Sequence, residues 1–204
     1  MALVGALRTF GAPAPLTLGV RPLMTCMLPA PINRGTSEVE SFESYLLRWR
    51  NEYRHVHQAI VETWVYRHWR DFQAWLPLHP LSWHYEAASM TNEEILTISR
   101  VGDWPQTLCY WGNDLLDGTQ RRKTWLGHYM LNNGTTPAPI IVAKHAGQVF
   151  HPRERGERMV EPYQIIEGHM RLAYLQAMIR RSHSTLTASH TVLVATIPNS
   201  ATAD

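Results

Sequence analysis

The sequence predicts an α+β protein in which a helical N-terminal region is followed by a small β-β-α-β domain. Before residue 131, apolar residues recur every three or four positions, as they do in amphipathic helices. Short runs rich in β-branched residues, typical of buried strands, appear only after residue 138. We expect a flexible Pro/Ala-rich arm at 1–36, a Trp-rich helical region at 37–131, the β-β-α-β domain at 132–198 and a tail at 199–204.

The composition is that of a globular chain. Of 204 residues, 45% are hydrophobic and 18% are charged, which supplies enough apolar surface for a core. The formal net charge of +2 does not indicate a nucleic-acid-binding protein. Cys26 and Cys109 form no CxxC pair, so neither a disulfide framework nor a cysteine zinc site is expected. No apolar run could span a bilayer, and we expect a cytoplasmic protein with no membrane partner.

The first 34 residues contain three arginines, five prolines and no acidic residue. A basic, apolar segment of this kind is also typical of targeting signals, but the prolines interrupt any apolar helix. We therefore expect an arm outside the folded unit, with a targeting segment as the alternative.

Two capping boxes and two prolines mark the expected helices. Ser37 to Glu40 precedes an apolar stripe from Phe42 to Ile60, which predicts one long helix ending before Pro77. Residues 77–89 are expected to form a loop. Thr91 to Glu94 then opens a short helix ending near Gly102. A further helix is expected to begin at Asp103-Trp104-Pro105 and to end at Gly118.

All eight tryptophans lie between residues 49 and 125, interleaved with arginines. Their helical spacing favours a core, or a surface that mediates homodimerisation through these helices. The alternative is stacking against nucleic-acid bases. The histidines of the same region form no HExxH pattern, and no metal site is expected from them. They are His55, His57, His68, His79 and His84.

The C-terminal part reads as strand, strand, helix, strand. The expected strands are 139–143, 164–166 and 191–197, and the helix is 170–181. Between the second strand and the helix lie Glu167, Gly168, His169, Met170 and Arg171. Glycine permits a tight turn, and the first amides and the dipole of a helix attract an anion. With His169 and Arg171 as further donors, the turn predicts a phosphate site; the alternative is a plain strand-to-helix turn.

The run IIEGHMR at 165–171 resembles the signature of the ParB/sulfiredoxin superfamily, in which a strand enters a Gly-x-x-Arg turn before a helix. It is nearest to the Asp-Gly-His-His-Arg form of free-serine kinases and uncharacterised ParB-like proteins. The resemblance covers residues 139–198. It implies that the domain binds ATP or CTP, with Mg²⁺, and that Gly168, His169 and Arg171 contact the phosphates.

The chain departs from two branches of that superfamily. No cysteine adjoins the turn, so sulfinic acid reduction is not expected. No later partition motif or helix-turn-helix follows residue 171, so a DNA-sliding clamp is not expected either.

The segment HPRERGER at 151–158 is either a solvated, salt-bridged loop or a loop that folds over the phosphate site. In the second case Arg153, Arg155 and Arg158 would contact the phosphates. A carboxylate would then bind magnesium or act as a base. The candidates are Glu167, Glu157 and Glu161, with Glu154 beside them.

These observations predict a nucleotide-binding ParB-like protein that acts as a phosphotransferase or nucleotide hydrolase. The alternative is a non-catalytic ParB-like module for partition or defence, with DNA or RNA as its partner.

Overall fold

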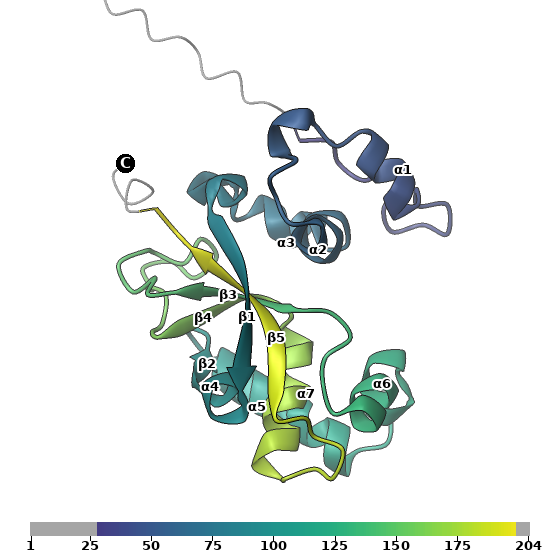
Figure 1. Cartoon of the computed structure of the whole chain (residues 1–204), viewed down its shortest axis with the longest axis vertical. Helices are drawn as coiled ribbons and strands as arrows, with labels where there is room; N and C mark the ends of the chain where they lie inside the picture. Colours follow the sequence, from purple (N-terminus) through teal and green to yellow (C-terminus); the bar gives the residue numbers. More distant parts are fainter. Residues whose placement is uncertain (1–27, 199–204) are drawn as a thin grey trace, which may run out of the picture.

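The structure is a computed structural model that describes residues 28–198. Five strands form one mixed sheet in the order β1-β5-β3-β4-β2 (Figure 1). The pairs β1/β5 and β3/β4 are antiparallel, and β5/β3 and β4/β2 are parallel. The α+β class is therefore confirmed. The strands are β1 (His84–Thr91), β2 (Ile98–Ser99), β3 (Ile140–Lys144), β4 (Tyr163–Glu167) and β5 (Ser189–Thr196).

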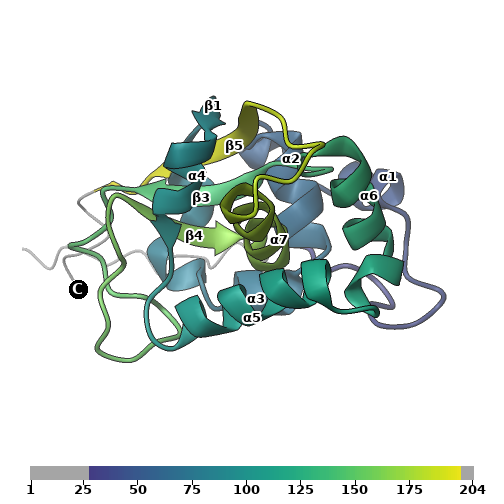
Figure 2. The ribbon, with the colours of Figure 1, turned by 90° about the horizontal axis from the view of Figure 1, so that it is seen from below.

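Helices cover both faces of this sheet. In Figure 1, α1 to α3 lie on one side, and α5, α6 and α7 lie on the other. Figure 2 shows α5 and α6 beside α7, which follows directly from β4. Gly112 lets α5 approach α7 closely, because a Cβ there would lie 2.4 Å from the Ala173 carbonyl oxygen. The helices are α1 (Phe42–Leu47), α2 (Gln58–Ile60), α3 (Trp69–Gln73), α4 (Asn92–Thr97), α5 (Trp104–Asp117), α6 (Trp125–Asn133) and α7 (His169–Arg180).

The central strands are apolar on both faces. Ile141 lies between Leu193 of β5 and Glu167 of β4, and it packs against the N-terminal helices. Its neighbours Ile140 and Val142 pack on the α7 side. This two-sided burial explains why the sequence of β3 reads as a continuous apolar run instead of an alternating one.

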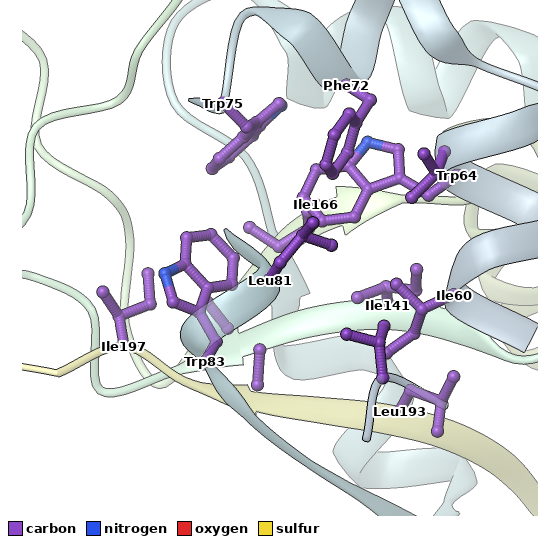
Figure 3. Packing of buried hydrophobic residues seen from close by; sticks show 14 of the residues in the cluster. Ile60, Trp64, Phe72, Trp75, Leu81, Trp83, Ile141, Ile166, Leu193 and Ile197 are labelled. Atoms are coloured by element: carbon purple, nitrogen blue, oxygen red, sulfur yellow. The ribbon is translucent and has the colours of Figure 1, made fainter. Parts of the chain in front are cut away.

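Three tryptophans fill the space between the sheet and the N-terminal helices. Trp64, Trp75 and Trp83 are each at most 3% exposed, and they belong to the same core cluster as Ile166 and Leu193 (Figure 3). The rings of Trp64 and Trp75 meet edge to face with centroids 5.8 Å apart, a favourable aromatic arrangement. For these three residues the interpretation of the tryptophans as core is confirmed.

The expected long helix from Ser37 is wrong. The helix α1 begins at Phe42, because the Ser41 hydroxyl accepts a hydrogen bond from the Ser44 amide at 3.1 Å. Glu40 does not complete the earlier capping box, since its carboxylate binds Arg48 and the Ile32 amide. After α1 the chain turns and re-forms as shorter helical segments at 51–53, 58–60, 61–66 and 69–73.

Two strands lie where none was expected. Residues 77–89 were expected to be a loop, but His84–Thr91 forms the edge strand β1. Most of its side chains are exposed, so the strand lacks the apolar alternation that a sequence pattern needs. The helix from Thr91 ends at Thr97 instead of near Gly102, and Ile98–Ser99 joins the sheet as β2.

Other expected boundaries are confirmed. Thr91 and Glu94 form the reciprocal capping box of α4. The helix α5 begins after Asp103 and ends at Gly118. The two later strands and the helix α7 lie within two residues of their expected positions.

The ends of the chain are described only in part. Residues 1–27 of the expected arm, and the expected tail at 199–204, lie outside the described residues. From Leu28 onward the chain packs on the core, and the Pro29 carbonyl accepts the Tyr45 hydroxyl at 2.9 Å. Within residues 28–198, no helix is both long and apolar enough to cross a membrane.

Candidate functional site

Gly168 makes the turn from β4 into α7. Its φ of +95° lies in the left-handed region, which glycine adopts without strain. A Cβ at this position would lie 3.1 Å from a guanidinium nitrogen of Arg171. The first amides of α7 have no partner within the helix, so the turn has the geometry that the sequence predicts for an anion site.

Arg171 holds this turn in place. Its guanidinium is buried and donates to the carbonyls of Ala138 and Pro139, at 2.9 and 2.8 Å. It also binds the carboxylate of Glu167. Arg171 therefore ties the start of β3, the end of β4 and the first turn of α7 together. Its direct contact with a phosphate stays a prediction.

Arg100 is a buried cation beside the same turn. It follows β2, which runs parallel to β4 with Ser99 level with Gln164, and it contacts Trp104, whose ring also contacts His169. Arg100 is 4% exposed, and its guanidinium lies over the Trp104 ring, 3.9 Å from the centroid. One of its nitrogens donates to Glu154 at 3.0 Å. The Nε and Nη1 atoms are buried and have no described partner.

His151 contributes a second buried donor. It is 3% exposed and packs edge-on against Trp75, with centroids 5.1 Å apart. Its Nδ1 accepts the Arg153 amide at 3.3 Å, so in the neutral ring the proton is on Nε2. That Nε2 atom is buried without a described partner. Burial lowers the pKa of His151 to about 4, and the charges of Arg100 and Arg153 add to the effect.

His169 is the first residue of α7 and contacts the other side of the cluster. The centroid of its ring lies 5.1 Å from that of Trp104, and the same indole packs against the Arg100 guanidinium. Its Nε2 is buried without a described partner. Burial lowers the pKa of His169 to about 3, and positive charge on Arg100 and His151 opposes protonation further.

Within residues 28–198, the buried side-chain nitrogens and oxygens without a partner all belong to Arg100, His151 and His169. We call these three residues the anion cluster. The Arg100 atoms and the His151 Nε2 are N–H donors, so the cluster lacks acceptors. Leaving a buried polar group unpaired costs about 1–3 kcal/mol, and more for a charged group. The arrangement can bind an anion that offers several oxygen atoms.

The arginines of the loop 145–162, between β3 and β4, lie in different surroundings. Arg153 pairs with Asp71 of α3 at 2.6 Å, and its charge acts on both histidines of the cluster. Arg158 is exposed and donates to Gln148 at 2.9 Å. Arg155 is exposed. Of these three, Arg153 is the one that the structure brings to the cluster; phosphate binding by each stays a prediction.

The three candidate carboxylates also lie in different surroundings. Glu167 is 8% exposed and lies at the turn, with its second oxygen 3.6 Å from the Nε2 atom of His68. Glu161 is exposed and accepts the Gly147 amide at 3.2 Å, which supports the start of the loop. Glu157 is exposed on the loop. Glu167 is thus the one of these three carboxylates that is buried at the turn.

Among residues 28–198, neither a group of metal ligands nor either of two cavities, of about 360 and 710 Å³, coincides with this site. Among residues 28–198, no three histidines, cysteines or acids are grouped as metal ligands. A cavity of about 360 Å³ lies between Leu46, Trp49 and Val61, in the N-terminal helices.

Arg100 and His151 were missed in the sequence. Arg100 follows a two-residue strand that has no recognisable pattern. His151 begins the arginine-rich segment, and its place directly before a proline and three arginines was the available signal.

The chain matches no protein-family model, and no match was found among curated proteins or solved structures. The resemblance to the ParB/sulfiredoxin superfamily stays a prediction that rests on residues 163–173 and the order of the strands around them.

Proposed function

We propose that this protein binds a phosphate-bearing ligand, a nucleotide such as ATP or CTP, at the N-terminus of α7. The observation that carries the proposal is the anion cluster. Arg100 and His151 are more than nine-tenths buried, and both have donors without acceptors beside the first turn of a twelve-residue helix.

Physical chemistry favours a phosphate over a smaller anion. Arg100 offers donors in a planar fork, which matches the spacing of phosphate oxygens. His151 adds a donor, and the helix amides and dipole add a further attraction for negative charge. A terminal phosphate has enough oxygen atoms to satisfy the guanidinium, the imidazole and the amides together.

The reaction we propose is phosphoryl transfer or nucleotide hydrolysis, as in the ParB-like proteins that the turn resembles. Glu167 supplies the carboxylate, because Arg171 fixes one of its oxygens and the other faces the half-exposed His68. Mg²⁺ would arrive bound to the nucleotide phosphates, which is its usual mode of binding in such sites.

Calorimetry with ATP, CTP, GTP and pyrophosphate, each with and without magnesium, tests the proposal. We expect at least one of them to bind, and Arg100→Gln to weaken that binding at least tenfold, about 1.4 kcal/mol. Arg181→Gln is the matched control, because it removes an exposed arginine at the far end of α7 that is bound to Asp117. Failure of all four ligands to bind would overturn the proposal. Binding without turnover would favour the non-catalytic alternative.

A further inference from the structure

Two ion pairs hold the loop 145–162 against the rest of the molecule. Arg153 of the loop binds Asp71 of α3 at 2.6 Å. Glu154, the next residue, binds Arg100 at 3.0 Å. The first pair is half-exposed, whereas in the second the Arg100 side chain is 4% exposed and that of Glu154 is 31% exposed. The loop thus places a carboxylate on the buried cation of the anion cluster.

We propose that the Glu154 carboxylate is an internal substitute for the ligand phosphate, and that a phosphate dianion binds by displacing it from Arg100. This inference rests on the proposed function, and it specifies how the ligand enters the site. Glu154 then acts as a positioning residue that holds the loop closed over the ligand-free site.

The guanidinium nitrogens of Arg100 that have no described partner support the displacement of Glu154 by a phosphate. Glu154 satisfies one nitrogen of the guanidinium, while Nε and Nη1 remain buried without a described partner. The carboxylate therefore engages the cation only in part. A phosphate oxygen pair would accept from two guanidinium nitrogens, and a third oxygen would face His151 or the helix amides.

The closed loop also explains why the cluster is covered. The unpartnered nitrogens of Arg100, His151 and His169 have almost no contact with solvent. Since Glu154 and His151 belong to the same loop, release of Glu154 would uncover the cluster from the loop side. Arg153 would keep one attachment of the loop through Asp71.

Removal of this internal carboxylate gives a direct test. Titration of pyrophosphate and of the preferred nucleotide into the full chain should show about tenfold tighter binding for Glu154→Gln than for wild type. Glu86→Gln is the matched control: it removes the same charge, but from an exposed residue of β1 that lies outside the loop. Its affinity should equal that of wild type. Circular dichroism checks that each variant is folded.

The possible outcomes separate the two proposals. Tighter binding by Glu154→Gln alone supports displacement. An equal gain in both variants would reflect overall charge, and it would overturn the inference while leaving the proposed function intact. Unchanged affinity in both variants would also overturn the inference and leave the proposed function intact. If neither wild type nor Glu154→Gln binds any phosphate, the proposed function fails, and the inference fails with it.

Discussion

Gly168 satisfies two requirements that no other residue type meets together. Its φ of +95° is strained for any side chain, and a Cβ would lie only 3.1 Å from the guanidinium of Arg171. The same guanidinium reaches the carbonyls of Ala138 and Pro139. The glycine is therefore needed for the packing of the turn, whatever ligand binds there.

Replacement of Gly168 by alanine should separate the energetic cost of backbone strain from the cost of the close contact with Arg171. Gly156→Ala is the control, since Gly156 also has a positive φ of +79° but nothing within 4 Å of its Cβ position. We expect Gly156→Ala to cost about 1 kcal/mol from backbone strain alone, and Gly168→Ala to cost about 2–3 kcal/mol. Urea unfolding measures both values. Equal losses would show that the contact with Arg171 contributes nothing.

The loop 145–162 and the helix α7 each bring one histidine to Arg100. Burial and nearby positive charge keep both imidazoles neutral, with pKa values of about 4 for His151 and about 3 for His169. An unfolded histidine has a pKa of about 6.5. Between these values the unfolded chain binds more protons than the folded one. Both residues therefore stabilise the fold above pH 6.5, and this stability is lost as the pH falls toward 4.

Acid should therefore loosen the contact between these two elements. Each histidine is expected to cost about 1.4 kcal/mol of unfolding free energy per pH unit below 6.5. Urea unfolding at pH 7.5, 6.5 and 5.5 measures the slope, and His151→Asn should reduce it. A slope that His151→Asn leaves unchanged would show that His151 titrates normally in the folded protein.

The sheet joins segments from before and after residue 132, the expected boundary between the helical region and the β-β-α-β domain. The strands β1 and β2 precede residue 132, and they form the two edges around β5, β3 and β4. The face of the sheet that carries Ile141 and Leu193 is covered by N-terminal residues such as Trp64. The anion cluster likewise takes Arg100 from one part and His151 and His169 from the other.

A fragment of residues 132–204 should therefore not fold alone. It would lack both edge strands and would expose the apolar face that Trp64, Trp75 and Trp83 cover. We expect weak near-ultraviolet circular dichroism and no cooperative thermal transition, whereas the full chain should unfold in one step. A sharp transition in the fragment would show that 132–198 is an independent domain.

Several parts of the molecule could be predicted from local sequence. The capping box of Thr91 and Glu94, the start of α5 at Asp103 and the glycine turn at Gly168 each depend on neighbouring residues. The strands β3 and β5 were visible because both their faces are buried, which produces an unbroken apolar run. Short-range chemistry and strong patterns were sufficient for these elements.

The remaining features depend on contacts between residues far apart in the chain. The exposed edge strand β1 forms because β5 offers hydrogen-bond partners, and its own pattern does not indicate this. The pairing of Arg171 with backbone carbonyls, and of Arg100 with Glu154, brings together residues separated by 32 to 54 positions. The glycine turn was thus specified by local sequence. Tertiary packing made Arg171 its anchor and brought together the buried, unpaired nitrogens of Arg100, His151 and His169, because burial and charge pairing arise only when the layers meet.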